Sequence, residues 1–117
     1  MAYYIEEIVM FDEFEGSFHN IATEDVIRLP PTATYIFLIL INNGSCPVER
    51  QQFFEQIYTK FGFDLSNNTL NQYISLLRKN LKNMGVDADV IITVPKVGFY
   101  ISADIKITEK KNNIPSY

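Results

Sequence analysis

The chain has 117 residues, of which 47% are hydrophobic and 21% are charged, which is the length and composition of one globular domain rather than of a disordered tract. Its single cysteine, Cys46, excludes an internal disulfide and favours a reducing, intracellular setting. The first residues are rich in acids and lack a basic segment, so no secretory signal peptide is expected. The longest apolar run, residues 35–41, is far shorter than the roughly 20 residues that cross a bilayer. We therefore expect a soluble protein.

The net charge of −4 is distributed unevenly along the chain. Residues 1–27 hold seven acidic residues and no Lys or Arg, whereas residues 28–117 hold seven acidic and ten basic residues. Because the neutralisation of phosphates dominates the affinity of proteins for nucleic acids, the net charge alone argues against such a partner. The charge of the docking surface decides the matter, however. The later, net positive part of the chain is compatible with a nucleic-acid partner.

The first thirty residues predict a small sheet. Residues that favour strands are mixed there with turn residues such as Gly16, and the region ends at Pro30-Pro31, which cannot continue a hydrogen-bonded ladder. We expect three or four short antiparallel strands within residues 1–30.

Three helices are predicted within residues 31–84. The first enters through Pro31 with Thr32 as a candidate cap, follows an almost entirely apolar stretch, and stops at Gly44. The second begins at Val48 and ends at Gly62. The all-round apolar character of the first helix indicates that it is buried.

The third predicted helix, residues 67–84, has two faces of different chemistry. At 100° per residue, one arc is apolar, and it holds Leu70, Ile74, Leu77, Leu81 and Met84. The opposite arc contains hydrogen-bond donors and no acid, and it holds Asn68, Asn71, Gln72, Ser75, Arg78, Lys79, Lys82 and Asn83. Such groups suit base edges and phosphates in a major groove, and the free amides near the capping residue, Ser66 or Asn67, suit a further phosphate. An ordinary solvated face has the same pattern, so this helix alone leaves both interpretations open.

Two strand-forming runs flank Pro95-Lys96-Val97-Gly98 and predict a β-hairpin over residues 90–102. Lys96 lies near its tip, and no acid occurs between Asp89 and Asp104. A lysine in a turn is often only solvated, so the hairpin alone indicates no function. A helix free of carboxylates followed by a cationic hairpin is nevertheless the layout of a winged helix.

With this layout, the chain resembles the OmpR/PhoB-type winged-helix DNA-binding domain of bacterial response regulators. The resemblance covers residues 24–103 and rests on the segments LPPTATYIFLILINNGSCPVERQQFFEQIY, NNTLNQYISLLRKNL and ITVPKVGFYI. The last two are most similar to the CadC/ToxR branch, whose members carry the domain at the cytoplasmic end of a membrane-anchored regulator. The expected fold is α+β, a winged helix-turn-helix within residues 1–103, followed by a C-terminal tail or linker over residues 104–117.

The resemblance implies a recognition helix over residues 67–84 in a major groove and a wing around Lys96 in a minor groove. The DNA contacts implied by the family or suggested by the polar arc are Asn68, Thr69, Asn71, Gln72, Tyr73, Ser75, Arg78, Lys79 and Lys82 on the helix, with Thr93 and Lys96 on the wing. Typical members carry arginines where Ser75 and Leu76 stand. The usual bidentate guanine contact is therefore missing, which leaves A/T contacts, shape readout or help from a partner.

The implied partner is double-stranded promoter DNA. Because the helix and wing offer only four cations, we expect binding as a homodimer or with a partner regulator. The resemblance also implies contact with RNA polymerase through the loop of residues 59–67, a cytoplasmic location and a membrane anchor C-terminal to this chain.

The rival interpretation is a winged helix that binds a regulator or RNA polymerase and has little DNA affinity of its own. The acidic N-terminal region would suit a basic protein partner. An enzyme, a metal site and a cofactor are not expected, because one histidine, His19, and one cysteine supply no metal cluster or nucleophilic dyad, and no phosphate-binding glycine motif occurs.

Overall fold

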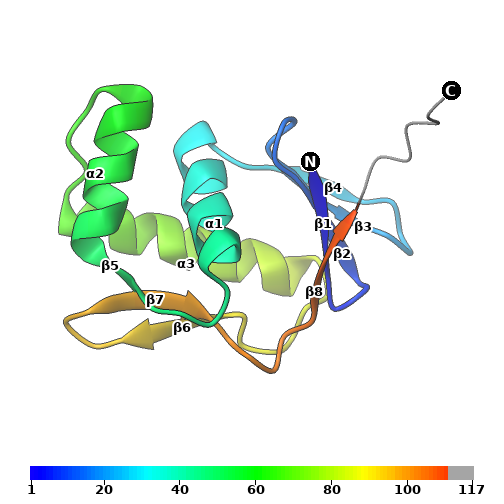
Figure 1. Ribbon diagram of the computed structural model, residues 1–117. Coiled ribbons are helices and arrows are strands. Elements are labelled where there is room, and N and C mark those ends of the chain that lie inside the picture. The colour runs from blue at the N-terminus through cyan, green and yellow to red at the C-terminus, as the bar shows by residue number, and fades with distance from the viewer. Residues whose placement is uncertain (111–117) are drawn as a thin grey trace, which may run out of the picture.

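The computed structural model describes residues 1–110, which form eight strands and three helices (Figure 1). The strands are β1 Ala2–Ile5, β2 Val9–Asp12, β3 Ser17–Asn20, β4 Val26–Arg28, β5 Val48–Glu49, β6 Ile91–Val94, β7 Gly98–Ile101 and β8 Ile107–Lys110. The helices are α1 Pro31–Asn43, α2 Arg50–Phe61 and α3 Asn67–Asn83. The expected fold class, an α+β winged helix-turn-helix with an N-terminal sheet, three helices and a hairpin wing, is confirmed.

The N-terminal sheet is antiparallel and has the strand order β4-β3-β2-β1-β8. Its first four strands lie in the region where three or four were expected. The fifth, β8, pairs with β1 and places Ile107 opposite Ile5. The expectation of a tail or linker after residue 103 was therefore wrong for residues 107–110. Residues 111–117, the rest of that expected tail, lie outside the described residues.

Helix α1 joins the sheet to the other helices. Its Phe37 is fully buried and meets Phe11 and Phe18 of the sheet edge to face, with ring centroids 4.9 and 5.3 Å apart. Pro31 begins the helix as predicted, but Thr32 does not cap it, because Pro30 occupies the capping position and the threonine side chain is buried. The apolar sequence of α1 thus forms the centre of the core.

Helix α2 begins two residues later than predicted because Val48 and Glu49 form β5, which pairs with β7. This pairing brings the two backbones so close that a Cβ atom on Gly98 would lie 1.8 Å from the carbonyl oxygen of Val48. Only glycine permits that approach. A capping box between Glu49 and Gln52 starts the helix, and Gly62, in the left-handed conformation with φ 80°, ends it as predicted.

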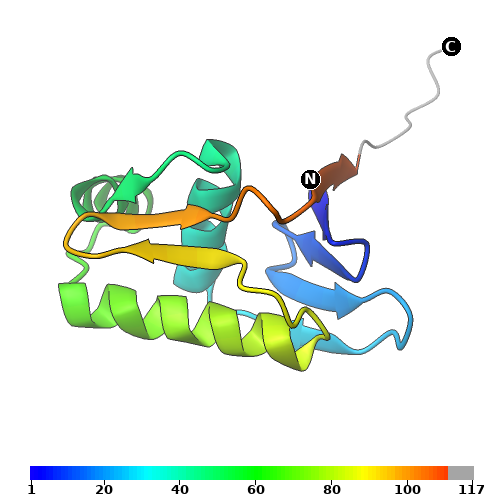
Figure 2. The same ribbon diagram turned by 90° about the horizontal axis from the view of Figure 1, so that it is seen from below.

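Helix α3 packs its apolar arc inward as predicted: the arc consists of Leu70, Ile74, Leu77, Leu81 and Met84, and all five are buried. Ser66 caps the helix, since its Oγ accepts a hydrogen bond of 3.1 Å from the backbone N–H of Thr69. Strands β6 and β7 form the predicted hairpin, which runs alongside α3 (Figure 2).

Within residues 1–110, no helix is both long enough and apolar enough to span a membrane.

Candidate nucleic-acid interface

The outward side of α3 forms a ridge of polar and basic side chains. Its exposed members, called the α3 ridge below, are Asn68, Asn71, Gln72, Ser75, Lys79 and Lys82. Three other predicted helix contacts, Thr69, Tyr73 and Arg78, are half-buried. No side chain of α3 carries a carboxylate, and none of these nine residues is buried. The predicted polar arc therefore faces solvent.

The wing lies beside α3, with its tip toward the first turns of this helix (Figure 2). Both predicted wing residues, Thr93 and Lys96, are exposed. Lys96 has a positive φ of 64° in the turn that closes with a 3.0 Å hydrogen bond from the N–H of Val97 to the carbonyl oxygen of Val94. A cation is thus presented at the end of a short antiparallel ribbon.

Arg78 connects α3 to the wing. Its Nε and Nη2 donate to the carbonyl oxygen of Ile91 at 3.2 and 2.8 Å, and Nη2 also donates to Oγ1 of Thr93 at 2.8 Å. Burial lowers the pKa of the Arg78 guanidinium, and the carboxylate of Asp89 acts in the opposite direction. An arginine stays protonated throughout the physiological pH range. Two predicted DNA contacts, Arg78 and Thr93, therefore bind each other and fix the wing against the helix.

The sequence interpretation missed Arg50, the first residue of α2. Its Nη1 donates to Oδ1 of Asn71 at 3.0 Å and lies 3.5 Å from Oδ1 of Asn67, and its guanidinium carbon lies 5.0 Å from the centroid of the Phe99 ring. One signal was available in the sequence. The first turn of a helix disfavours cations, because the helix dipole is positive there, and α2 has no acid in that turn. A basic residue at that position indicates a role outside the helix itself.

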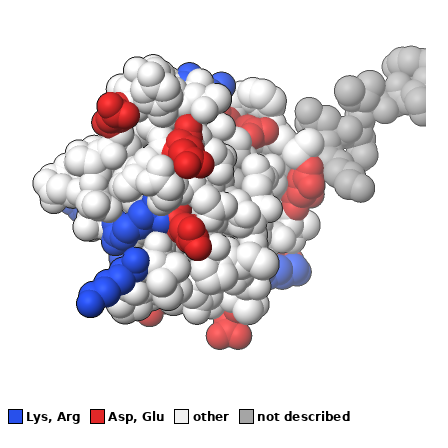
Figure 3. Space-filling model, turned by 60° about the vertical axis from the view of Figure 1, so that its left-hand side comes forward, with Lys and Arg blue, Asp and Glu red and all other residues white. Residues whose placement is uncertain are grey.

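Arg50 and Lys96 together line a hollow between the start of α2 and the wing. Its volume is about 410 Å³, and its lining residues are Glu49, Arg50, Gln51, Phe54, Asn67, Lys96 and Val97. Figure 3 shows basic side chains close together at the lower left of this side of the molecule, with others at the top and at the right and acidic side chains between them. Positive charge is thus concentrated locally on a surface of mixed charge.

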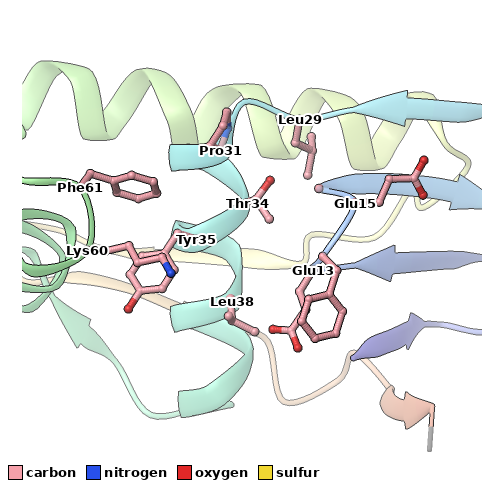
Figure 4. Close-up of a pocket in the computed structure, with 11 residues that line it drawn as sticks. Glu13, Glu15, Leu29, Pro31, Thr34, Tyr35, Leu38, Lys60 and Phe61 are labelled. Atoms are coloured by element: carbon pink, nitrogen blue, oxygen red, sulfur yellow. The ribbon is translucent and has the colours of Figure 1, made fainter. Parts of the chain in front are cut away.

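A second hollow, of about 350 Å³, lies between the turn after β2, helix α1 and the end of α2 (Figure 4). We call it the α1–α2 groove. Tyr35 and Phe61 meet edge to face there with ring centroids 5.8 Å apart, and Nζ of Lys60 lies 5.7 Å from the centroid of the Tyr35 ring. On its far side stand Glu13 and Glu15. An aromatic groove with acidic side chains on one wall suits protein better than a polyanion.

The family of the chain follows from a comparison with protein-family models. Residues 23–101 match the family described as "Transcriptional regulatory protein, C terminal". The chain belongs to this family. Its members are OmpR/PhoB-type DNA-binding domains of transcriptional regulators and not enzymes. The family and the DNA-binding function expected from the sequence are thereby confirmed, whereas the individual DNA contacts stay predictions.

Individual relatives agree with this assignment. The chain is 28% identical over 89 residues to the "Cholera toxin transcriptional activator" of Vibrio cholerae, an alignment that covers 76% of this chain and 30% of the relative. The C-terminal domain of the nisin resistance regulator NsrR is 29% identical and superposes with a TM-score of 0.62, over 74% of this chain and 84% of that domain. The DNA-binding domain of Escherichia coli CadC has the same fold, with a TM-score of 0.70 at 19% identity over 85% of this chain and 90% of that domain. The chain spans about a third of the length of the curated relatives it matches.

Proposed function

We propose that this domain binds double-stranded promoter DNA with the α3 ridge in a major groove and the wing tip around Lys96 in the adjacent minor groove. One observation carries the proposal: the exposed side of α3 offers amides, a hydroxyl and ammonium groups without a single carboxylate, and a wing with a cation at its tip lies beside it. Amides and hydroxyls suit base edges, and cations suit phosphates.

The proposal divides the work among the predicted contacts. Lys79 and Lys82 bind phosphates, and Asn71 and Gln72 face base edges. The remaining predicted contacts are grouped by where they lie. Asn68, Thr69, Tyr73 and Ser75 lie on or beside the ridge. Arg78 and Thr93 lie where helix and wing meet, and Lys96 lies at the wing tip.

A selection of bound sequences from random DNA, followed by titrations at several salt concentrations, tests this division. We expect Lys79→Ala and Lys82→Ala each to weaken binding to every sequence and to lower the slope of log affinity against log salt by about 1, whereas Gln72→Ala changes the preferred sequence. Lys60→Ala is the matched control, because Lys60 is exposed but lies in the α1–α2 groove. If the ridge variants bind DNA as the wild type does, the rival function, a protein-binding winged helix, replaces this one.

We further propose that the domain acts as a homodimer or beside a partner regulator. Few cations are available at the proposed interface, and neutralising about three or four phosphates gives only weak binding for one copy at physiological salt.

A contact with RNA polymerase through residues 59–67 is the second proposal about partners. The loop expected there is shorter in the structure, because α2 extends to Phe61 and α3 begins at Asn67, which leaves residues 62–66 as the loop. Phe63 in this loop is 41% exposed and pairs with Phe61, whose ring also lines the α1–α2 groove. Exposed aromatic side chains are frequent anchors of protein interfaces. We expect Phe63→Ala to leave DNA affinity unchanged and to reduce transcription by purified RNA polymerase from a promoter that the wild type activates. Equal transcription with both proteins would contradict the contact.

We also propose that the domain works in the cytoplasm as part of a longer regulator with a membrane anchor after it. The similarity to the CadC/ToxR branch and the greater length of the curated relatives support this proposal. A stop codon directly after the codon for Tyr117 in the source gene would contradict a C-terminal anchor.

A further inference from the structure

The hydrogen bond between Arg50 and Asn71 joins a residue outside the predicted site to a residue of the α3 ridge. The donor is Nη1 of Arg50, the acceptor is Oδ1 of Asn71, and the two atoms are 3.0 Å apart. Within residues 1–110, Nδ2 of Asn71 donates to no protein group, and the side chain is exposed. Only the nitrogen end of this carboxamide is therefore without a protein partner.

The chemistry of arginine fixes which end of the carboxamide faces it. A guanidinium has five N–H donors and no acceptor, so the carboxamide must present its oxygen to Arg50. A rotation of the amide by 180° would place N–H groups against N–H groups. The orientation of Asn71 thus follows from the identity of its neighbour.

Arg50 is itself held in place by the wing and by α3. Its backbone N–H donates to the carbonyl oxygen of Val97 at 3.0 Å, and its guanidinium lies near the buried ring of Phe99, with 5.0 Å from the guanidinium carbon to the ring centroid. The oxygen of Asn67 lies 3.5 Å from the same Nη1. A cation supported by an aromatic ring, by the oxygen of Asn67 and by a backbone bond to the wing is a fixed reference for the Asn71 side chain.

We propose that Arg50 is a positioning residue for sequence readout: it holds the oxygen of Asn71 away from the DNA, so that Asn71 meets the base edge as a donor through Nδ2. This inference rests on the proposed function and specifies the readout by that same site. In the major groove, guanine presents acceptors at N7 and O6, thymine an acceptor at O4, and adenine an acceptor at N7 beside the donor N6, whereas cytosine presents only a donor at N4. Asn71 therefore selects against cytosine, and it reaches adenine only through N7, with the N6 donor of adenine left unmatched.

Asparagine usually pairs with adenine through two hydrogen bonds, and the geometry opposes that bidentate pair here. The bidentate pair with adenine needs the oxygen and the nitrogen of the carboxamide against the same base edge, to accept from N6 and to donate to N7. Arg50 holds the oxygen toward α2 and the wing. The pair with adenine would require Asn71 to leave Arg50.

The decisive variant is Asn71→Asp in the full chain, measured on a random DNA pool and then on four duplexes that differ at one base pair. The base pair to vary is the one at which the Asn71→Ala variant no longer shows the base preference of the wild type. Aspartate keeps an oxygen for Arg50 and replaces the donor by an acceptor, so the discrimination against cytosine is lost and the preference moves to cytosine or adenine, whose N4 and N6 groups are donors. The affinity for all four duplexes falls because a carboxylate now faces the polyanion. Thermal unfolding of the variant checks that the fold is retained. An unchanged base preference would overturn the inference.

Arg50→Met provides the second test, because methionine fills similar space without a donor. The carboxamide of Asn71 is then free to turn, so the bidentate pair with adenine becomes possible and cytosine can donate to the freed oxygen. The discrimination against cytosine drops by about fivefold, the loss of one oriented hydrogen bond. Lys96→Ala is the matched control: it removes a cation from the same hollow and lowers affinity for all four duplexes equally. If Arg50→Met behaves like Lys96→Ala, Arg50 only adds charge and the inference fails while DNA binding stands. A wild type that binds no DNA would refute the proposed function itself.

Discussion

Arg78 determines how firmly the wing is held beside α3. Three hydrogen bonds from its guanidinium reach the carbonyl oxygen of Ile91 and the hydroxyl of Thr93. Truncation removes charge-assisted bonds and leaves the carbonyl oxygen of a buried residue without this partner, so we expect Arg78→Ala to lower the free energy of unfolding by about 2 kcal/mol. Chemical denaturation measures that loss, and hydrogen exchange of the hairpin amides locates it in the wing.

A lysine at the same position separates structure from charge. Arg78→Lys keeps the cation but cannot reproduce the forked contact with two acceptors, so its stability should lie close to that of Arg78→Ala, while its DNA affinity should fall less. If Arg78→Ala unfolds at the denaturant concentration of the wild type and loses only DNA affinity, Arg78 acts on phosphate alone and the structural role assigned to it is wrong.

Among the elements, the helices could be predicted because their determinants are local. The apolar arc of α3 and its capping by Ser66 involve neighbours within a few turns, and the exposed ridge follows from the same periodicity. Strand β5 could not be predicted, because Val48 and Glu49 carry no strand pattern and become a strand only by pairing with β7. Strand β8 was missed for the same reason: only Ile107 of its four residues is apolar, and its partner lies about a hundred residues earlier.

In the candidate site, too, features determined within one helix could be predicted, and contacts between elements could not. Sequence periodicity placed every predicted contact of α3 at a solvent-accessible position, because a helix face is determined within the helix. The bond between Arg50 and Asn71 joins residues 21 positions apart on two helices, and the three bonds of Arg78 link α3 to a strand. These pairings depend on how the elements pack. The sequence therefore indicated which side chains face solvent, but not which of them hold one another.

For the whole molecule, the distribution of charge determines how tightly one copy can bind. The acids of residues 1–27 belong mainly to the N-terminal sheet and its turns, while the proposed interface has its cations on α2, α3 and the wing. Repulsion of DNA by the acidic sheet restricts docking to the ridge and wing. The proposed interface has five cations, Arg50, Arg78, Lys79, Lys82 and Lys96, and two of them are occupied with protein partners.

At the scale of the whole molecule, we predict that a single copy binds DNA weakly and that this binding depends strongly on the salt concentration. With about three or four phosphates neutralised, the slope of log affinity against log salt should be about −2.7 to −3.6, and Kd on one half-site should be micromolar or weaker at physiological salt. A second half-site placed one helical turn away, about 10 base pairs, should raise occupancy steeply, because the second copy or partner regulator then binds at high effective concentration. Fluorescence titrations on DNA with one half-site, with two, and with two at a spacing changed by half a turn measure this difference. Tight binding by an isolated monomer that hardly changes with salt would show that one ridge and one wing suffice, and the requirement for a dimer or partner would be wrong.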